Sequence, residues 1–166
     1  MAPRGGRRNV DRVRKAGTDV GEHQIVVCEL KTECYGIDIS KVFEIIRLQP
    51  ITAVPAAPSY VDGVINLRGR IVPVVDLAVM FGMPHTAESK ASRIVVVGSG
   101  ESRVGLIVDG VSQVLMVAED AVDPTPPVAG GGNSDYLRGI ARVADSLIML
   151  LDLDAIFGEQ ELAFAA

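Results

Sequence analysis

Apolar residues in this chain occur in short runs rich in Val and Ile, separated by polar or glycine-containing turns. Such runs are typical of β-strands, whereas an amphipathic helix places apolar residues at a spacing near 3.6. The expected strands are 25–30, a run around 36, 42–48, 64–67, a run ending at 76, 94–97, a run around 105, 111–117, 140–143 and a run ending at 152. The pattern predicts a mainly β protein built from hairpins.

The same order of strands occurs twice. The stretch YVDGVINLRGRIVPVVDLAVMFG (60–82) aligns without a gap with YLRGIARVADSLIMLLDLDAIFG (136–158). QIVVCELKTECYGIDISKVFEII (24–46) aligns in the same way with RIVVVGSGESRVGLIVDGVSQVL (93–115). The second copy has the longer loop, DPTPPVAGGGNSD, between its matched stretches. Two matches in the same order indicate an internal duplication.

The two similar halves, about 24–82 and 93–158, each contain about five expected strands. Five short strands in about 60 residues suit a small closed barrel, which also hides the sheet edges. We therefore predict one barrel per half. The expected fold is mainly all-β, with two packed five-stranded barrels and short helical turns.

Helical turns are expected after the two Asp-Leu pairs. Asp76 and Asp152 are candidate N-caps, because a short acceptor side chain can bond the free N–H groups of a first helical turn. Gly82 and Gly158 fit the C′ position, where a left-handed residue ends a helix. Pro73 lies inside a strand pattern, so that strand should bulge, bend or lie at an edge there.

The composition indicates a soluble, cytoplasmic protein. Apolar residues make up 48% of the chain, enough for a core, and aromatic residues only 4%. No apolar run reaches the roughly 18 residues of a membrane span, and the N-terminus lacks the apolar region of a signal peptide. Cys28 and Cys34 are too few for a disulfide framework or a four-thiolate zinc site, so reduced and partly buried thiols are expected.

Charge is distributed unevenly along the chain. Residues 1–21 carry six basic and two acidic side chains, a net charge of +4, so the rest carries −9 within the total of −5. We expect residues 1–22 to form a disordered basic leader and residues 161–166 to form a C-terminal tail. An acidic body with few aromatic residues argues against a nucleic-acid-binding platform.

Signatures of an active site are absent from the sequence. His23 and His85 are the only histidines and no HxH, HExxH or CxxC spacing occurs, so no metal site is expected. There is no GxSxG or phosphate-binding glycine motif, and Gly130-Gly131-Gly132 indicates a flexible loop. The two Asp-Leu carboxylates are expected to cap helices, not to form a catalytic pair. We expect no enzyme activity and no cofactor, which leaves protein–protein recognition.

The turn at residues 68–70, Arg-Gly-Arg, has no counterpart in the second half, where Ala-Asp-Ser stands at 144–146. Fold requirements explain what both halves share, but they do not explain what one half alone has. The asymmetry favours a role for these arginines in binding a protein. The alternative is that the two arginines are solvent-exposed turn residues with no role in binding.

Four stretches together resemble the CheW family, the coupling proteins of bacterial and archaeal chemotaxis. They are ECYGIDISKVFEII (33–46), PSYVDGVINLRGRIVPVVDL (58–77), VGLIVDGVSQVL (104–115) and DYLRGIARVADSLIMLLDLDAIF (135–157). The NLRG-x-[IV]-x-P-[IV]-x-DL pattern is specific. The resemblance covers residues 23–158, and a CheW-like domain is expected over 23–160.

The resemblance implies two SH3-like barrels and a scaffold, not an enzyme. Its implied partners are the cytoplasmic tip of a methyl-accepting chemoreceptor and the regulatory domain of a CheA-type histidine kinase. The implied location is the cytoplasm, in receptor arrays at the inner face of the membrane, without membrane insertion or nucleic acid.

Positions that match the family motifs imply two sets of contact residues. The receptor-binding set is Asn66, Leu67, Arg68, Val42 and Glu44. The kinase-binding set is Ile94, Gly105 and Val114, the first two on strands expected at the surface of the second half. The resemblance assigns no role to Arg70 or to the basic leader.

Two alternatives stay open at this level. An adaptor of the same fold could serve a receptor–kinase array outside chemotaxis, and its sequence would look the same. A small-barrel ligand-binding protein would instead need an internal pocket with convergent polar groups.

Overall fold

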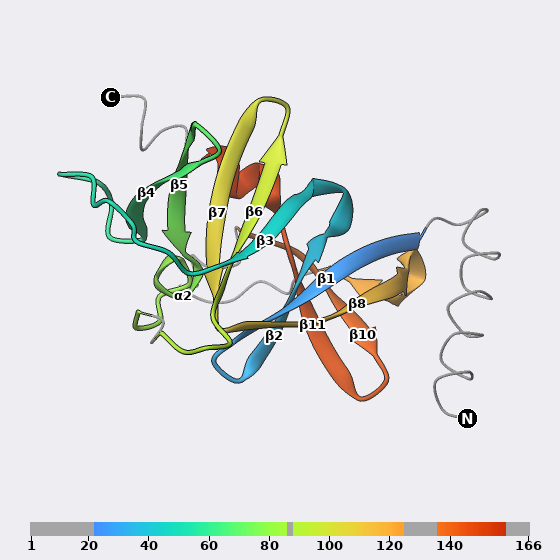
Figure 1. The fold of residues 1–166 in the computed structure, drawn as a ribbon. Helices are drawn as coiled ribbons and strands as arrows, with labels where there is room; N and C mark the ends of the chain where they lie inside the picture. The colour runs from blue at the N-terminus through green and yellow to red at the C-terminus, as the bar shows by residue number, and fades with distance from the viewer. Residues whose placement is uncertain (1–21, 86–87, 125–135, 159–166) are drawn as a thin grey trace.

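The computed structural model describes residues 22–85, 88–124 and 136–158, which form two β-sheets lying against each other, with short helical segments (Figure 1). The expected leader (1–22), apart from Glu22, the expected tail (161–166) and the glycine run at 130–132 lie outside the described residues. Within the described part of the chain, no helix is long and apolar enough to cross a membrane.

In the described part of the chain, sheet A has six strands and sheet B has five. The strands of sheet A, in spatial order, are β8 (Gly110–Ala118), β1 (Glu22–Leu30), β2 (Glu33–Asp38), β11 (Ser146–Leu151), β10 (Leu137–Val143) and β9 (Val122–Asp123). Those of sheet B are β3 (Val42–Arg47), β6 (Arg93–Ser99), β7 (Ser102–Val108), β5 (Arg70–Asp76) and β4 (Val61–Leu67). Neighbours are antiparallel except for the parallel pairs β2–β11 and β5–β7. The helical segments are η1 (Ile39–Lys41), α2 (Leu77–Met80), η2 (Glu119–Ala121) and residues 153–158.

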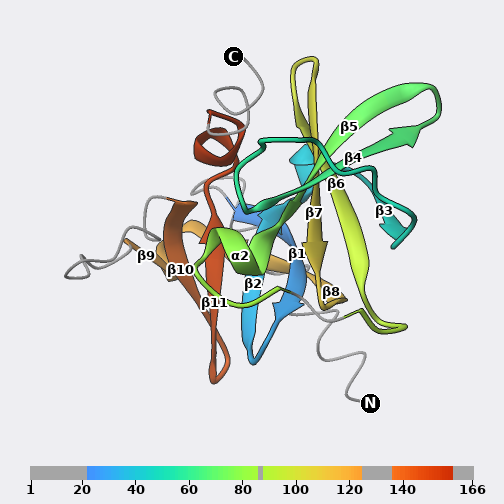
Figure 2. The same cartoon turned by 90° about the vertical axis from the view of Figure 1, so that its left-hand side faces the viewer.

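Each sheet combines strands from both halves of the sequence. β1 and β2 lie in sheet A beside strands of the second half, and β6 and β7 lie in sheet B beside strands of the first half. Figure 2 shows the blue β1–β2 hairpin next to the orange-red β10–β11 hairpin. The order β8-β1-β2-β11-β10 in sheet A matches β3-β6-β7-β5-β4 in sheet B, so the two copies of each strand occupy equivalent places.

The predicted mainly β fold with two barrel-like units is confirmed, but the prediction of one barrel per sequence half is wrong. The first hairpin of each half completes the sheet of the other half. The physical reason is that strands pair through backbone groups, which are the same in both copies. Duplicated hairpins are therefore interchangeable partners, as in domain swapping.

The apolar core formed by the described residues has three parts. One cluster lies in the interior of the barrel-like unit of sheet A and consists of Ile25, Val27, Val117, Ala141, Ile148 and Leu150. A second cluster lies in the interior of the barrel-like unit of sheet B and consists of Ile65, Val72, Val74, Ile94, Val96 and Ile107. The largest cluster joins the two sheets and includes Val26, Val95 and Leu106 from the opposite faces of the exchanged hairpins. Burial on both faces explains why these hairpins have continuous apolar runs instead of alternating ones.

The predicted caps of α2 are confirmed. Asp76 Oδ1 accepts a hydrogen bond from the Ala78 N–H at 3.0 Å. Gly82 follows with a left-handed φ of 80°, and its N–H donates to the Val79 carbonyl at 2.9 Å. The Met83 N–H donates to the Ala78 carbonyl at 2.8 Å, which completes a Schellman motif.

The second helix has the predicted N-cap but not the predicted C′ residue. Asp152 Oδ1 accepts from the Ala155 N–H at 3.1 Å. Gly158 is still helical and is absent from the residues with positive φ. The expectation for Gly158 is wrong because residues 153–158 continue the helix beyond the length of its α2 counterpart.

Replacing Asp152 by alanine should lower the free energy of unfolding by about 1 kcal/mol, because the helix loses its side-chain cap. Asp152→Asn keeps an acceptor and should stay within about 0.5 kcal/mol of the wild type. Urea unfolding followed by circular dichroism measures both. Equal losses for the two variants would contradict the capping role.

Pro73 lies where the prediction allows it. β5 pairs with β7 only from Val74 to Asp76, so Pro73 precedes this pairing and has a strand, β4, on one side only. A residue without an N–H is tolerated at such an edge. The bulge in this hairpin falls on β4, between Val61 and Gly63.

Candidate protein-binding groove

The β4–β5 turn presents Arg68 to solvent. Arg68 and Gly69 have positive φ values of 54° and 82°, the conformation favoured in tight two-residue hairpin turns. Asn66 Oδ1 accepts a hydrogen bond from the Gly69 N–H at 2.9 Å and holds the turn. Ala144 begins the equivalent turn with a φ of 53°. The first turn position therefore does not require an arginine, and the Arg68 side chain is available for other contacts.

An ion pair connects Arg68 to strand β3. Arg68 Nη1 lies 2.6 Å from Glu44 Oε2, and the two side chains are 77% and 22% exposed. The structure thus brings together two residues that the family resemblance implied for one contact set. Because Glu44 is the more buried partner, it orients the guanidinium while leaving much of it open to solvent.

A groove of about 200 Å³ lies beside this ion pair. Its lining residues are Phe43, Glu44, Leu67, Arg68, Arg70, Val72, Val96 and Arg103. Three guanidinium groups and one carboxylate therefore surround an apolar floor. In a chain with a net charge of −5, this groove is locally positive.

Arg103 reaches the groove from β7, in the second half of the sequence. Its guanidinium carbon lies 3.6 Å from the centroid of the Phe43 ring, a cation–π contact. Its Nη1 donates to the carbonyls of Gly100 and Ser102 at 2.9 and 2.8 Å. An added Cβ at Gly98 would lie 2.5 Å from the Phe43 ring, so this glycine makes room for the stack.

Phe43 faces outward on β3, a strand whose side chains alternate between half-buried and exposed. The pairing with β6 shifts between Val42 and Glu44, which leaves Phe43 as the extra residue. The Phe43 side chain is 53% exposed, and Ile45 on the same strand is 41% exposed. Exposed apolar side chains next to charged ones are typical of a binding surface.

The predicted receptor set is only partly brought together. Glu44, Leu67 and Arg68 line the groove, and Asn66 supports its turn. Val42 is half-buried against the core between the sheets and does not line the groove.

Sequence reasoning missed Phe43 and Arg103, and it left Arg70 without a role. Arg70 lines the groove and donates a hydrogen bond to the Glu101 carbonyl. The sequence did contain a signal for Phe43, since it is one of only four phenylalanines and directly precedes the charged Glu44 in an expected strand. No sequence signal pointed to Arg103, because only the exchange of hairpins between the sheets brings it to the groove.

The predicted kinase set separates into one exposed and two buried residues. Val114 is 47% exposed on β8, the terminal strand of sheet A. Ile94 has 0% exposure, and a Cβ on buried Gly105 would lie 2.7 Å from Ile94 Cγ2. The expectation that Ile94 and Gly105 lie at the surface is wrong, because β6 and β7 are interior strands of sheet B.

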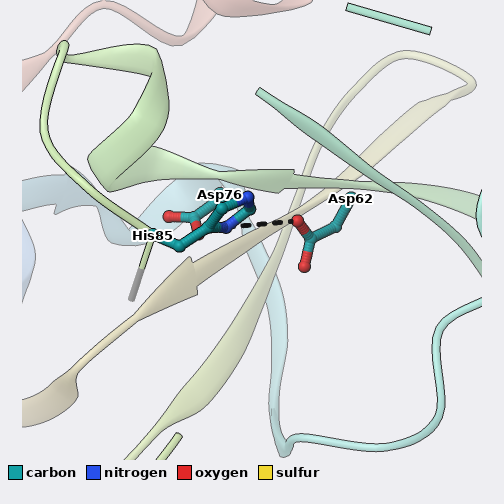
Figure 3. Close-up of side chains that lie close together, drawn as sticks. All are labelled: Asp62, Asp76 and His85. Carbon is teal, nitrogen blue, oxygen red and sulfur yellow. Dashed lines mark hydrogen bonds and ion pairs between the residues drawn. The ribbon is translucent and has the colours of Figure 1, made fainter. Parts of the chain in front are cut away.

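A second polar cluster lies apart from the groove lining. His85 Nδ1 is 2.7 Å from Asp76 Oδ2 and 3.7 Å from Asp62 Oδ1 (Figure 3). Burial raises the pKa of Asp62, the neighbouring Asp76 carboxylate raises it further, and His85 partly opposes the increase. Sequence reasoning did not associate these residues, because they come from a strand, a helix cap and a loop.

The barrel interiors and the thiols offer no sign of ligand or redox chemistry in the described residues. Both interiors are filled by apolar clusters, so the small-barrel ligand-binding alternative gains no support. Cys28 and Cys34 are free, as expected. Burial, with a contribution from Glu29, raises the pKa of the Cys28 thiol to about 12, which keeps it protonated and unreactive.

Comparisons with known proteins agree on one family. The model of the CheW-like domain matches residues 24–161. The chain is 34% identical over 148 residues to "Chemotaxis protein CheW" of Klebsiella aerogenes, covering 89% of each protein. It is 34% identical over 145 residues to the protein of the same name from Treponema pallidum, covering 85% of each. The crystal structure of the scaffolding protein TtCheW from Thermoanaerobacter tengcongensis matches with a TM-score of 0.73 and 39% identity, covering 78% of this chain and 88% of that one. The chain belongs to the CheW family.

Proposed function

We propose that this chain is a chemotaxis scaffold that couples chemoreceptors to a CheA-type histidine kinase. The observation that carries the proposal is the CheW-like domain match over residues 24–161. Support comes from relatives named as chemotaxis proteins and from a structural relative described as a scaffolding protein. The proposal assigns the chain no reaction, and it locates the chain in the cytoplasm beside receptor arrays.

The groove next to the β4–β5 turn would accept the cytoplasmic tip of the receptor. Phe43 and Leu67 would bury apolar area against the receptor, at about 25 cal/mol per Å². Arg68 would bind a receptor carboxylate or carbonyl through its two-pronged guanidinium. Its ion pair with Glu44 holds the guanidinium near the groove before binding, which reduces the entropy lost on association.

The kinase would bind a different face. β8 is the terminal strand of sheet A, and Val114 on it is an exposed apolar residue. A kinase regulatory domain of similar fold could dock against such an edge. Separate faces would let one scaffold hold receptor and kinase at the same time.

The test is assembly from purified components. The full chain, a CheA-type kinase and a cytoplasmic receptor fragment, all from the source genome, should co-elute as a three-component complex in size-exclusion chromatography. Val114→Asp should remove the kinase and retain the receptor fragment. A chain that binds neither component would contradict the proposal. Assembly only with the receptor and kinase of a non-chemotaxis array would favour the alternative adaptor role.

A further inference from the structure

Asp62, Asp76 and His85 form a compact aspartate–histidine cluster outside the groove (Figure 3). One potential ligand atom from each residue lies within 4.8 Å of the others. The Asp76 side chain is only 2% exposed and has partners inside the protein. Its Oδ1 accepts a hydrogen bond from the Ala78 N–H, and its Oδ2 lies 2.7 Å from His85 Nδ1.

The second half of the sequence has different residues around the equivalent position. In the internal alignment, Asp76 lies opposite Asp152, and Asp62 lies opposite Arg138. The small pocket beside Asp152 is lined by Asp38, Lys41, Arg138, Leu151, Asp152, Leu153 and Asp154. Two cationic side chains thus accompany the carboxylates there. The first half has a second carboxylate in place of the arginine, so this position offers a potential cation ligand where the second half has a cationic side chain.

The cluster is accessible from solvent. The His85 side chain is 65% exposed. Asp62 also borders an open pocket whose other lining residues are Leu48, Gln49, Pro50, Ile51 and Glu88. An ion can therefore reach the cluster without opening the barrel.

We propose that Asp62, Asp76 and His85 bind a divalent transition-metal cation of the zinc class. Imidazole nitrogen with carboxylate oxygen is a ligand set that suits zinc. Two ligands of a tetrahedral zinc ion are about 3.4 Å apart, given zinc–ligand bonds near 2.1 Å. The separations of 2.7 and 3.7 Å from His85 Nδ1 to the two carboxylates bracket this value. Water completes the coordination.

The ion has a structural role in this proposal. It joins β4, the end of β5 and the segment after α2, three pieces of the chain that meet at one end of the β4–β5 hairpin. The same hairpin carries the Arg68 turn at its other end. The site does not depend on the proposed function, since it is defined by residues outside the groove lining.

Isothermal titration of the metal-stripped full chain with ZnCl₂ tests the proposal. The wild type should bind one Zn²⁺ ion and show a higher Tm in its presence. Asp62→Asn and His85→Gln should each weaken binding by at least about tenfold, since even loss of an outer-shell partner costs roughly 10–100-fold. Asp76 is left unchanged because it also caps α2.

Two control variants test the assignment. His23→Gln removes the other histidine, which pairs with Glu119 at 2.6 Å, and Cys34→Ser removes the half-buried thiol. Both should bind Zn²⁺ like the wild type, and circular dichroism verifies that all variants are folded. The proposal is overturned if the wild type binds no Zn²⁺. It is equally overturned if Asp62→Asn and His85→Gln both retain the site, or if a control variant loses it.

Discussion

Replacing Gly63 by alanine should destabilise the protein by at least about 3 kcal/mol, or roughly 6–12 °C in Tm. Gly63 has a φ of 149°, which side-chain-bearing residues rarely adopt. An added Cβ would lie 2.1 Å from the Thr52 carbonyl oxygen, far inside contact distance. Thr52 cannot easily move, because it exchanges two backbone hydrogen bonds with Val64, at 2.9 and 2.8 Å. Thermal unfolding of the purified variant measures the loss.

Gly100→Ala is the matched control for this prediction. Gly100 also has a left-handed φ, 60°, but nothing lies within 4 Å of its missing Cβ. Its replacement adds the backbone strain without a clash and should cost only about 1–2 kcal/mol. Similar losses for Gly63→Ala and Gly100→Ala would contradict the steric explanation.

Replacing Arg68 by alanine should weaken binding of the receptor tip by at least about 2 kcal/mol, roughly 30-fold, the loss typical of an arginine hot spot. This prediction rests on the proposed function. The Arg68 side chain is 77% exposed, so its removal should leave the fold and the Tm almost unchanged. Glu44 would remain in place without its ion-pair partner, and the groove would lose one of its three guanidinium groups. Titration of a receptor fragment into each protein measures the effect.

Two further variants separate geometry from charge. Arg68→Lys keeps the charge but loses the guanidinium fork, so it should bind with intermediate affinity. Arg142→Ala removes another exposed arginine, which pairs with Asp123 at 2.8 Å on sheet A, and should bind the receptor like the wild type. Wild-type affinity in Arg68→Ala, or an equal loss in Arg142→Ala, would refute the assigned contact.

Local sequence patterns predicted the strands, the duplication and the helix N-caps. Short Val- and Ile-rich runs become strands because their side chains pack well on a pleated surface. Asp76 and Asp152 cap helices because the acceptor and the N–H groups lie within three residues of each other in the chain. The pair Gly63 and Gly139 recurs because a Cβ at either position would approach a backbone oxygen, at 2.1 and 2.8 Å. Each of these features depends on residues that are close in the sequence or recurs in both halves. A single sequence is therefore enough to recognise them.

Local sequence patterns did not predict which strands pair with each other or which residues meet at the sites. The exchange of hairpins between the sheets places Arg103 on Phe43, and it buries Ile94 inside a barrel instead of at the surface. Asp62 and His85 meet because the chain folds back after α2. Strand pairing uses backbone groups that every residue shares, so a sequence indicates where strands lie much better than which strands they join. Contacts between distant segments depend on which strands pair, and only the tertiary structure determines that pairing.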